Sequence, residues 1–120
     1  MTIREFALFC QCSTETLRYY DRVGLLKPET VDNLSGVRSY RKEQALLFIR
    51  IRQLLLAGFT VSDIRRMVGE SEDVIEGAFI SMIDQQKQKL ERLEEVHADY
   101  GDMVLKMKEK IETESREKRS

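Results

Sequence analysis

The spacing of hydrophobic residues predicts mostly helix, in two regions of different kind. Up to about residue 69, apolar positions recur at intervals of three and four in short runs that glycines and turn residues interrupt. Beyond residue 78, one helical period continues to residue 111. The pattern therefore predicts several short packed helices followed by one long helix.

Two short helices with a tight corner between them are predicted at the start of the chain. Thr2 and Glu5 have capping-box spacing ahead of a helix over residues 3–9. Ser13 is a preferred N-cap residue for a second helix over residues 14–23. Gly24 follows directly, so the second helix should end there.

A β-hairpin and two further helices complete the first region. Residues 29–40 lack helical periodicity and hold a turn cluster followed by β-prone residues. A strongly apolar helix should begin near Lys42 and end at Gly58. Thr60 should cap a short helix over residues 61–68.

These elements predict a mainly α fold, a winged helix-turn-helix with a small β-hairpin wing over residues 1–69, followed by a long coiled-coil helix. The charge differs between the regions. Residues 1–69 carry 11 Lys or Arg against 7 Asp or Glu, a net of +4. Residues 70–120 carry 9 against 14, a net of −5. A basic first region suits contact with a polyanion, and the acidic second region suits a solvated helix.

Three segments of the sequence have the residues and the order typical of a known protein family. TETLRYYDRVGLLKP, SGVRSY and IRQLLLAGFTVSDIRRM follow one another within residues 2–69. In that order and spacing they resemble the DNA-binding domain of MerR-type transcriptional regulators. The resemblance implies a homodimer on a pseudo-palindromic promoter site, which distorts the promoter spacer and acts together with RNA polymerase. We expect no cofactor, and the residues identify neither the effector nor the choice between activation and repression.

Side chains on the second helix, on the wing and at the start of the fourth helix are the candidates for contact with DNA. Arg18 leads them, because its guanidinium can bind phosphate or guanine and it matches the arginine of the family's recognition helix. Glu15 either accepts a hydrogen bond from cytosine or only favours the helix N-terminus. The full candidate set is Thr14, Glu15, Thr16, Arg18, Tyr19, Tyr20, Arg38, Tyr40, Thr60 and Ser62.

Several of these assignments have a structural alternative. Tyr19 and Tyr20 are neighbours on a helix and diverge by about 100°, so one packs and the other faces DNA. Tyr40 is either a wing contact or a core residue at the base of the wing. Thr60 and Ser62 either bind phosphate or only cap their helix.

The sequence departs from the family pattern at the corner and in the wing. Gln11 stands where the family has Gly, and a positive φ there would cost on the order of 1 kcal/mol. Cys12 stands at an aliphatic core position. Two cysteines and one distant histidine cannot supply a closed zinc site, so we expect no metal at Cys10 and Cys12. Val37 stands where the family often has Tyr, so one phosphate-binding hydroxyl is missing.

The long helix has the pattern of a dimerisation helix. Apolar residues recur along it with heptad spacing and form one stripe. This apolar stripe would be exposed on a single helix, so we expect it to pack against a second copy, and the family resemblance implies an antiparallel pair. Gln86 and His97 interrupt it and are expected to fix its register. We expect a linker over residues 70–78, the coiled coil over 79–112 and a frayed tail over 113–120. The dimerisation residues are Phe79, Ile83, Gln86, Leu90, Leu93, His97, Tyr100, Val104, Met107 and Ile111.

Other classes of protein find less support. The chain has no Gly-rich phosphate loop, nucleophile elbow or metalloprotease motif, so we expect no enzyme. It has no apolar run long enough to span a bilayer, so we expect a cytoplasmic protein without membrane contact. The alternative is a coiled-coil adaptor that uses the helix-turn-helix for protein contact. The chain is either a fragment of a longer regulator or a compact member whose effector binds near the junction of the DNA-binding domain and the long helix. Phe79, Met82 and Tyr100 either line an apolar pocket there or pack as core residues.

Overall fold

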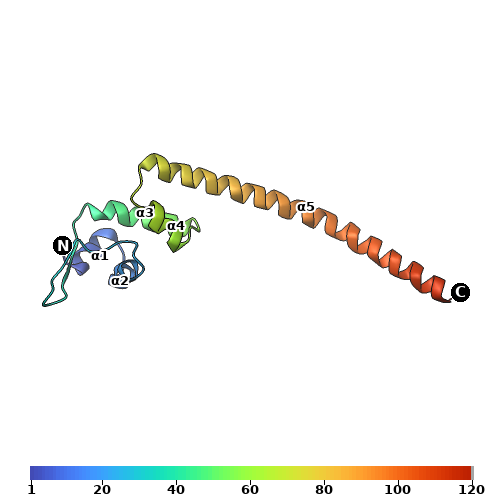
Figure 1. The fold of residues 1–120 in the computed structure, drawn as a ribbon, viewed down its shortest axis with the longest axis horizontal. Helices are drawn as coiled ribbons and strands as arrows, with labels where there is room; N and C mark the ends of the chain where they lie inside the picture. Colours follow the sequence, from blue (N-terminus) through green and yellow to red (C-terminus); the bar gives the residue numbers. More distant parts are fainter. Residues whose placement is uncertain (120) are drawn as a thin grey trace. The chain divides into compact units, whose positions relative to one another are not determined.

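The computed structural model describes residues 1–119 and confirms the mainly α fold (Figure 1). It divides into two compact units, Met1–Glu76 and the chain from Gly77 onward. Ser120, in the predicted tail, lies outside the described residues. The elements are α1 (Ile3–Cys10), α2 (Thr14–Arg22), β1 (Thr30–Val31), β2 (Arg38–Ser39), α3 (Gln44–Leu56), α4 (Val61–Met67) and α5 (Glu72–Arg119).

The predicted caps at the start of the chain are present. The backbone N–H of Glu5 donates to the Thr2 hydroxyl at 3.2 Å, and the backbone N–H of Thr2 donates to the Glu5 carboxylate at 3.1 Å. These two bonds complete a capping box for α1 and hold the pKa of Glu5 below its usual value. Ser13 caps α2 by accepting from the backbone N–H of Thr16 at 3.1 Å.

The corner between α1 and α2 adopts the left-handed conformation that the family's glycine would favour. Gln11 has φ 58° and ψ 50°, and it is the one residue other than glycine with positive φ among those described. The backbone N–H of Cys12 donates to the carbonyl of Ala7 at 2.9 Å, which closes the corner. Gln11 therefore carries the backbone strain that the sequence indicated, on the order of 1 kcal/mol.

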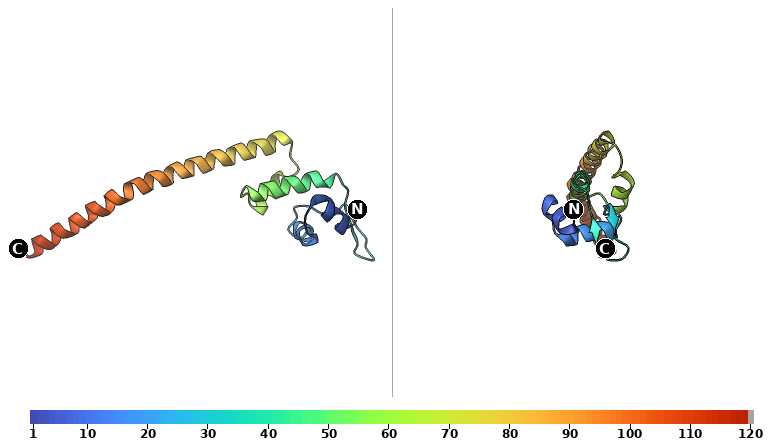
Figure 2. Two further views of the ribbon diagram at one scale, coloured as in Figure 1. Left: turned by 180° about the vertical axis from the view of Figure 1, so that it is seen from behind. Right: turned by 90° about the vertical axis from the view of Figure 1, so that its left-hand side faces the viewer.

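The helices of the first unit share one small core. Helix α1 contacts both α2 and α3, and α3 contacts α4. The hairpin β1–β2 projects from these helices as a narrow wing (Figures 1 and 2). Burial of large apolar side chains supplies most of the stabilisation of such a unit. The side chains with essentially no exposed surface are Phe6, Leu17, Tyr40, Phe48, Ile51, Leu54 and Ile64.

Arg50 joins α3 to the residues that follow α4. Its guanidinium donates to the backbone carbonyls of Val68 and Glu70, both at 2.7 Å, and to the carboxylate of Glu72. The Arg50 side chain is 14% exposed, whereas that of Glu72 is 84% exposed. The carbonyls at the end of a helix lack partners within the helix, so Arg50 satisfies groups that would otherwise need water.

We expect Arg50→Ala to lower the free energy of unfolding by about 2 kcal/mol, because hydrogen bonds from a charged group to partly buried carbonyls are lost. Glu72→Ala should cost less than about 1 kcal/mol, because its carboxylate is exposed and screened. Urea unfolding followed by tyrosine fluorescence measures both, since three of the four tyrosines lie in the first unit. Equal losses for the two variants would contradict the role given to the carbonyl bonds.

Helix α5 begins earlier than the sequence suggested. Within the segment 70–78 that was expected to be a linker, the structure is helical from Glu72 onward. The hydroxyl of Ser71 accepts from the backbone N–H of Val74 at 3.4 Å, and Glu72 and Asp73 place negative charge at the helix N-terminus. The tail is also helical through residue 119. The division of roles along residues 70–120 remains a prediction.

The stripe predicted for dimerisation is open to solvent along the second unit. Leu93 is 64% exposed and Tyr100 is 66% exposed, and neighbouring stripe positions are exposed to a similar degree. A long helix with that much exposed apolar surface needs a partner in water. Within residues 1–119, no helix combines the length and hydropathy required of a membrane span.

Candidate nucleic-acid interface

Helix α2 presents a charged outer face over an apolar inner face. Leu17 and Tyr20 are buried beneath it, while Glu15 and Arg18 are exposed. Thr14 and Thr16 are half-buried at the first turn. The Thr16 hydroxyl lies 2.9 Å from that of Ser13, so it belongs to the cap as well as to the candidate surface. The outer face therefore offers one carboxylate and one guanidinium, with hydroxyls at the N-terminus of the helix.

The structure decides between the two adjacent tyrosines. Tyr20 is 5% exposed, and its ring centroid lies 5.6 Å from that of Phe48 in the core. Tyr19 is 38% exposed, and the guanidinium of Arg22 lies 5.5 Å from its ring centroid. Tyr20 was wrongly included among the candidate contacts, since its side chain packs between helices. Tyr19 is the outward tyrosine.

Arg22 is a candidate that the sequence analysis missed. It lies four residues after Arg18, so the two guanidinium groups lie on one face of α2. The signal was available in the sequence, since the same helical spacing that placed Arg18 outward also places Arg22 outward. Its contact with the Tyr19 ring orders both side chains on that face.

The wing is built around an aspartate-centred turn. The carboxylate of Asp32 accepts from the backbone N–H groups of Leu34 and Ser35 at 2.8 and 3.0 Å. These bonds lower the pKa of Asp32 and fix the turn between the strands. Gly36 has φ 72°, a conformation that glycine adopts without strain. The antiparallel register pairs Val31 with Arg38.

An ion pair joins the wing to α2. Nε of Arg38 donates to the carboxylate of Asp21 at 3.0 Å, and the Asp21 side chain is only 17% exposed. Lys27 approaches the same carboxylate at 3.5 Å. Arg38 uses Nε in this bond, so its terminal amino groups can still donate to an anion. The pair sets the position of the wing relative to α2.

Tyr40 belongs to the core, so its place among the candidate contacts is wrong. It is 2% exposed, and its ring stacks on that of Phe6 with centroids 4.6 Å apart. The backbone of Tyr40 also pairs with Met1, whose carbonyl accepts from the Tyr40 N–H at 2.7 Å. Its hydroxyl is buried without a hydrogen-bond partner among the described residues. Burial, and then the Asp21 carboxylate, raise the pKa of Tyr40.

A groove of about 230 Å³ is lined by the wing, the start of α1 and Arg18 of α2, and we call it the α2–wing groove. It brings together Arg18 and Arg38, which are distant in the sequence. Among the ion pairs of residues 1–119, Arg18 has no carboxylate partner. Two guanidinium groups beside one groove attract phosphate. The residues that line it are Thr2, Ile3, Arg18, Ser35, Gly36, Val37 and Arg38.

The start of α4 presents the remaining candidates. The Thr60 hydroxyl accepts from the backbone N–H of Asp63 at 3.1 Å and so caps α4, while Ser62 is exposed. Arg66 donates to the carboxylate of Asp63, and Arg65 donates to the carbonyl of Val23 at 3.3 Å. The contact of Arg65 links α4 to the end of α2. Thr60 can still donate its own hydroxyl proton to an anion.

The two cysteines are free thiols beside the corner. Burial, and then the neighbouring Cys12, raise the pKa of Cys10 to about 11. Burial also raises the pKa of Cys12. Thiols with raised pKa values are protonated near neutral pH and are poor nucleophiles and metal ligands. Among the described residues, no group of three or more His, Cys, Asp or Glu side chains could hold a metal ion.

Comparison with known proteins adds to this geometry. Residues 1–70 match the family described as MerR HTH family regulatory protein. The mercuric resistance operon regulatory protein of Bacillus cereus is 34% identical over 67 residues, which is 56% of this chain and 50% of that protein. The matched segment thus spans about half the length of that relative.

Two solved structures have a similar fold. The N-terminal part of MtaN, the multidrug transporter activator of Bacillus subtilis, has a TM-score of 0.66 at 22% identity, covering 88% of this chain and 98% of that one. EcmrR, in a cryo-EM structure of its DNA complex, has a TM-score of 0.58 at 28% identity, covering 75% of this chain and 34% of that one. Both similarities include more than the wing and its neighbouring helices.

Proposed function

The chain belongs to the MerR family of helix-turn-helix regulatory proteins, and from this premise we propose that it binds promoter DNA as a homodimer and regulates transcription. Members of this family are transcription regulators, not enzymes. The site is a pseudo-palindrome, and the dimer distorts the promoter spacer in response to an effector. The observation that carries the proposal is the α2–wing groove, which Arg18 and Arg38 line from two separate elements.

Helix α2 enters the major groove in this proposal. Arg18 donates to guanine or to phosphate, and Glu15 accepts from cytosine or lies beside the helix N-terminus. Tyr19 offers its hydroxyl to phosphate, and Arg22 extends the same face by one helical turn. Thr14 and Thr16 lie at the first turn, where backbone N–H groups and hydroxyls can meet phosphate oxygens.

The wing and α4 supply contacts to the DNA backbone. The terminal amino groups of Arg38 bind phosphate while Nε holds Asp21. Val37 is exposed but has no hydroxyl, so its contact with DNA is apolar. Thr60 and Ser62 bind a second phosphate through their hydroxyls. Phosphate contacts of this kind fix the register of the protein on the duplex without reading sequence.

Dimerisation through α5 gives the protein two DNA-binding units, one for each half of the DNA site. The apolar stripe from Phe79 to Ile111 is exposed over most of its length and has the heptad spacing of a coiled coil, and a second copy is the partner that covers it. A two-fold dimer requires a site with matching two-fold symmetry. The DNA complex of EcmrR, in a state that includes RNA polymerase, supports promoter DNA and the polymerase as partners here.

Two tyrosine variants test which side chain faces DNA. Tyr19→Phe should weaken DNA binding roughly tenfold, because a hydrogen bond to a charged phosphate is lost. Tyr40→Phe should leave DNA binding unchanged, and it should raise the free energy of unfolding by up to about 1 kcal/mol because it removes a buried hydroxyl without a partner. Fluorescence anisotropy with labelled DNA and urea unfolding supply the two measurements. A larger loss of DNA affinity in Tyr40→Phe than in Tyr19→Phe would indicate that Tyr40, and not Tyr19, contacts DNA.

The experiment that tests the function is a salt-dependent titration of the whole chain. A duplex from upstream of its own gene is compared with a scrambled duplex. The proposal expects tighter binding of the native duplex, with log K falling against log salt by about 0.9 per phosphate neutralised. Absence of binding to either duplex would favour the adaptor alternative.

A further inference from the structure

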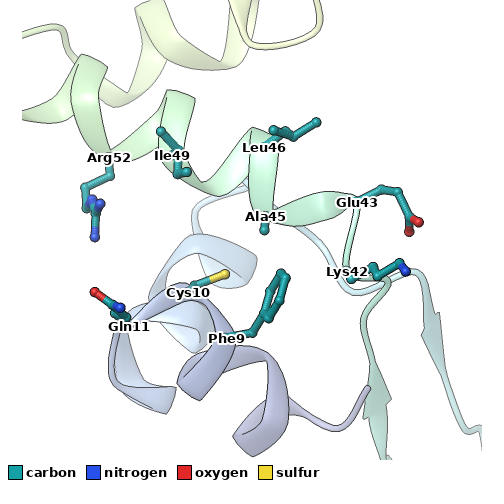
Figure 3. A pocket seen from close by; sticks show the side chains of 9 residues that line it. All are labelled: Phe9, Cys10, Gln11, Lys42, Glu43, Ala45, Leu46, Ile49 and Arg52. Carbon is teal, nitrogen blue, oxygen red and sulfur yellow. The ribbon is translucent and has the colours of Figure 1, made fainter.

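A second groove lies between the end of α1 and α3, on residues that the proposed DNA interface does not use. It has a volume of about 550 Å³, within the range typical of sites for small organic ligands. In Figure 3, Phe9 and Cys10 point from α1 toward α3, and Ala45 points back toward them. We call it the α1–α3 groove. It is lined by Phe9, Cys10, Gln11, Lys42, Glu43, Ala45, Leu46, Ile49 and Arg52.

Large apolar side chains of this groove are exposed to solvent. Phe9 is 54% exposed, Leu46 is 75% exposed and Ile49 is 48% exposed. They come from two helices and line one concavity, unlike isolated apolar residues on a surface. Exposed apolar clusters in a concavity typically mark a binding site, because filling them removes apolar area from water.

A positively charged side chain lies at one end of the α1–α3 groove. In Figure 3 the guanidinium of Arg52 extends from α3 toward Gln11. The Arg52 guanidinium lies 5.4 Å from the centroid of the Phe48 ring, a distance at which a cation–π contact favours this position. Among the ion pairs of residues 1–119, neither Arg52 nor Lys42 pairs with a carboxylate. Glu43 lies at the opposite end, beside Lys42.

Gln11 lies at the same end of the α1–α3 groove as Arg52. Its left-handed backbone would be less strained with glycine, yet the position carries a side chain that lines the groove. Its amide group lies on the side from which Arg52 approaches (Figure 3). An amide N–H beside a guanidinium can complete the hydrogen bonding of a carboxylate or sulfonate.

We propose that the α1–α3 groove binds a small amphipathic organic anion. Its apolar body packs on Phe9, Ala45 and Ile49, and its acidic group binds Arg52 and Gln11. The guanidinium of Arg52 provides two parallel donors that match a carboxylate or sulfonate. This site goes beyond the proposed function and does not depend on DNA binding, because ligand binding is measured on the free protein.

The test uses two fluorescent probes with the same aromatic body. 1-Anilinonaphthalene-8-sulfonate carries one negative charge, and N-phenyl-1-naphthylamine lacks it. The whole chain should bind the sulfonate saturably and more tightly than the neutral amine. Arg52→Gln should weaken sulfonate binding about tenfold, the loss of one charge-assisted contact, and change amine binding less than about twofold. Arg22→Gln is the matched control, since Arg22 also lies over an aromatic ring, and it should change neither.

A second pair of variants tests the role of the apolar side chains in the α1–α3 groove. Ile49→Asp places a carboxylate in the groove and should weaken both probes about tenfold or more. Leu56→Asp makes a similar change at an exposed position of α3 outside the groove and should leave both unchanged. Circular dichroism checks that each variant is folded, and Arg52→Gln keeps the test decisive if Ile49→Asp fails to fold.

Three results would overturn the proposal. One is absence of saturable binding of the sulfonate to the folded protein. Another is equal loss in the groove variants and in their controls, which would indicate adsorption elsewhere. The third is a change in association state of Ile49→Asp without probe, measured by sedimentation equilibrium, which would assign the groove to an interface between two copies of the chain.

Discussion

Replacing Leu93 with glutamate should convert the proposed dimer largely to monomer. In a homodimer each substitution acts twice, and two buried leucines contribute about 3–6 kcal/mol. Removing that contribution weakens association by a factor of roughly 10² to 10⁴. Two carboxylates placed in an apolar seam add a desolvation cost in the same direction. Binding to DNA with two half-sites should weaken by roughly 10² or more. In a dimer, binding of one protomer holds the other beside the second half-site, and separate monomers lose this advantage.

Leu105→Glu is the matched control for this prediction. Leu105 lies on the same helix and is 56% exposed against 64% for Leu93, but it is outside the predicted seam. Sedimentation equilibrium of the two variants measures the dimer constant, and DNA titration measures the consequence. Dimerisation that survives Leu93→Glu and fails with Leu105→Glu would place the interface on a different face of α5.

Arg18→Ala should lower the affinity for the native promoter duplex by about 1–3 kcal/mol per contact. Arg18 is exposed on α2 and lines the α2–wing groove, and among the ion pairs of residues 1–119 it has no carboxylate partner. Its guanidinium is therefore available to DNA without breaking a contact in the protein. If it contacts guanine, the loss should be confined to the native duplex. If it contacts phosphate, binding to every duplex should weaken and the salt slope should fall by about 1.

Arg116→Ala removes the same charge far along the chain, near the end of α5, and should leave affinity unchanged. Arg38→Ala should have a mixed effect, because it removes a phosphate donor and also releases Asp21. Thermal unfolding of each variant separates loss of contact from loss of structure. Unchanged affinity of Arg18→Ala for the native duplex would remove α2 from the proposed interface.

Local sequence signals predicted the helices of the first unit well. The caps at Thr2, Ser13 and Thr60 accept the hydrogen bonds expected of them. Gly58 follows the end of α3 with φ 98°, as its place in the sequence suggested. Such signals succeed because a cap or a terminal glycine satisfies backbone groups within a few residues of itself.

The early start of α5 shows where local signals were misread. The heptad stripe begins at Phe79, whereas the cap at Ser71 allows the helix to begin before it. Residues before Phe79 do not belong to the stripe, since Ile75 is buried in the first unit instead. Helicity at Glu72 follows from the cap and from the ion pair with Arg50, which lies 22 residues earlier.

By itself, the sequence determined the order of the helices, the wing, the outward position of Arg18 and the exposed stripe of α5, because periodicity and capping act over short stretches of chain. Only the tertiary structure decided that Tyr20 and Tyr40 are core residues, that Asp21 holds Arg38, and that Arg18 and Arg38 line one groove. Those outcomes depend on how α1, α2, α3 and the wing pack. Packing joins residues far apart in sequence, and no spacing within one segment encodes such contacts.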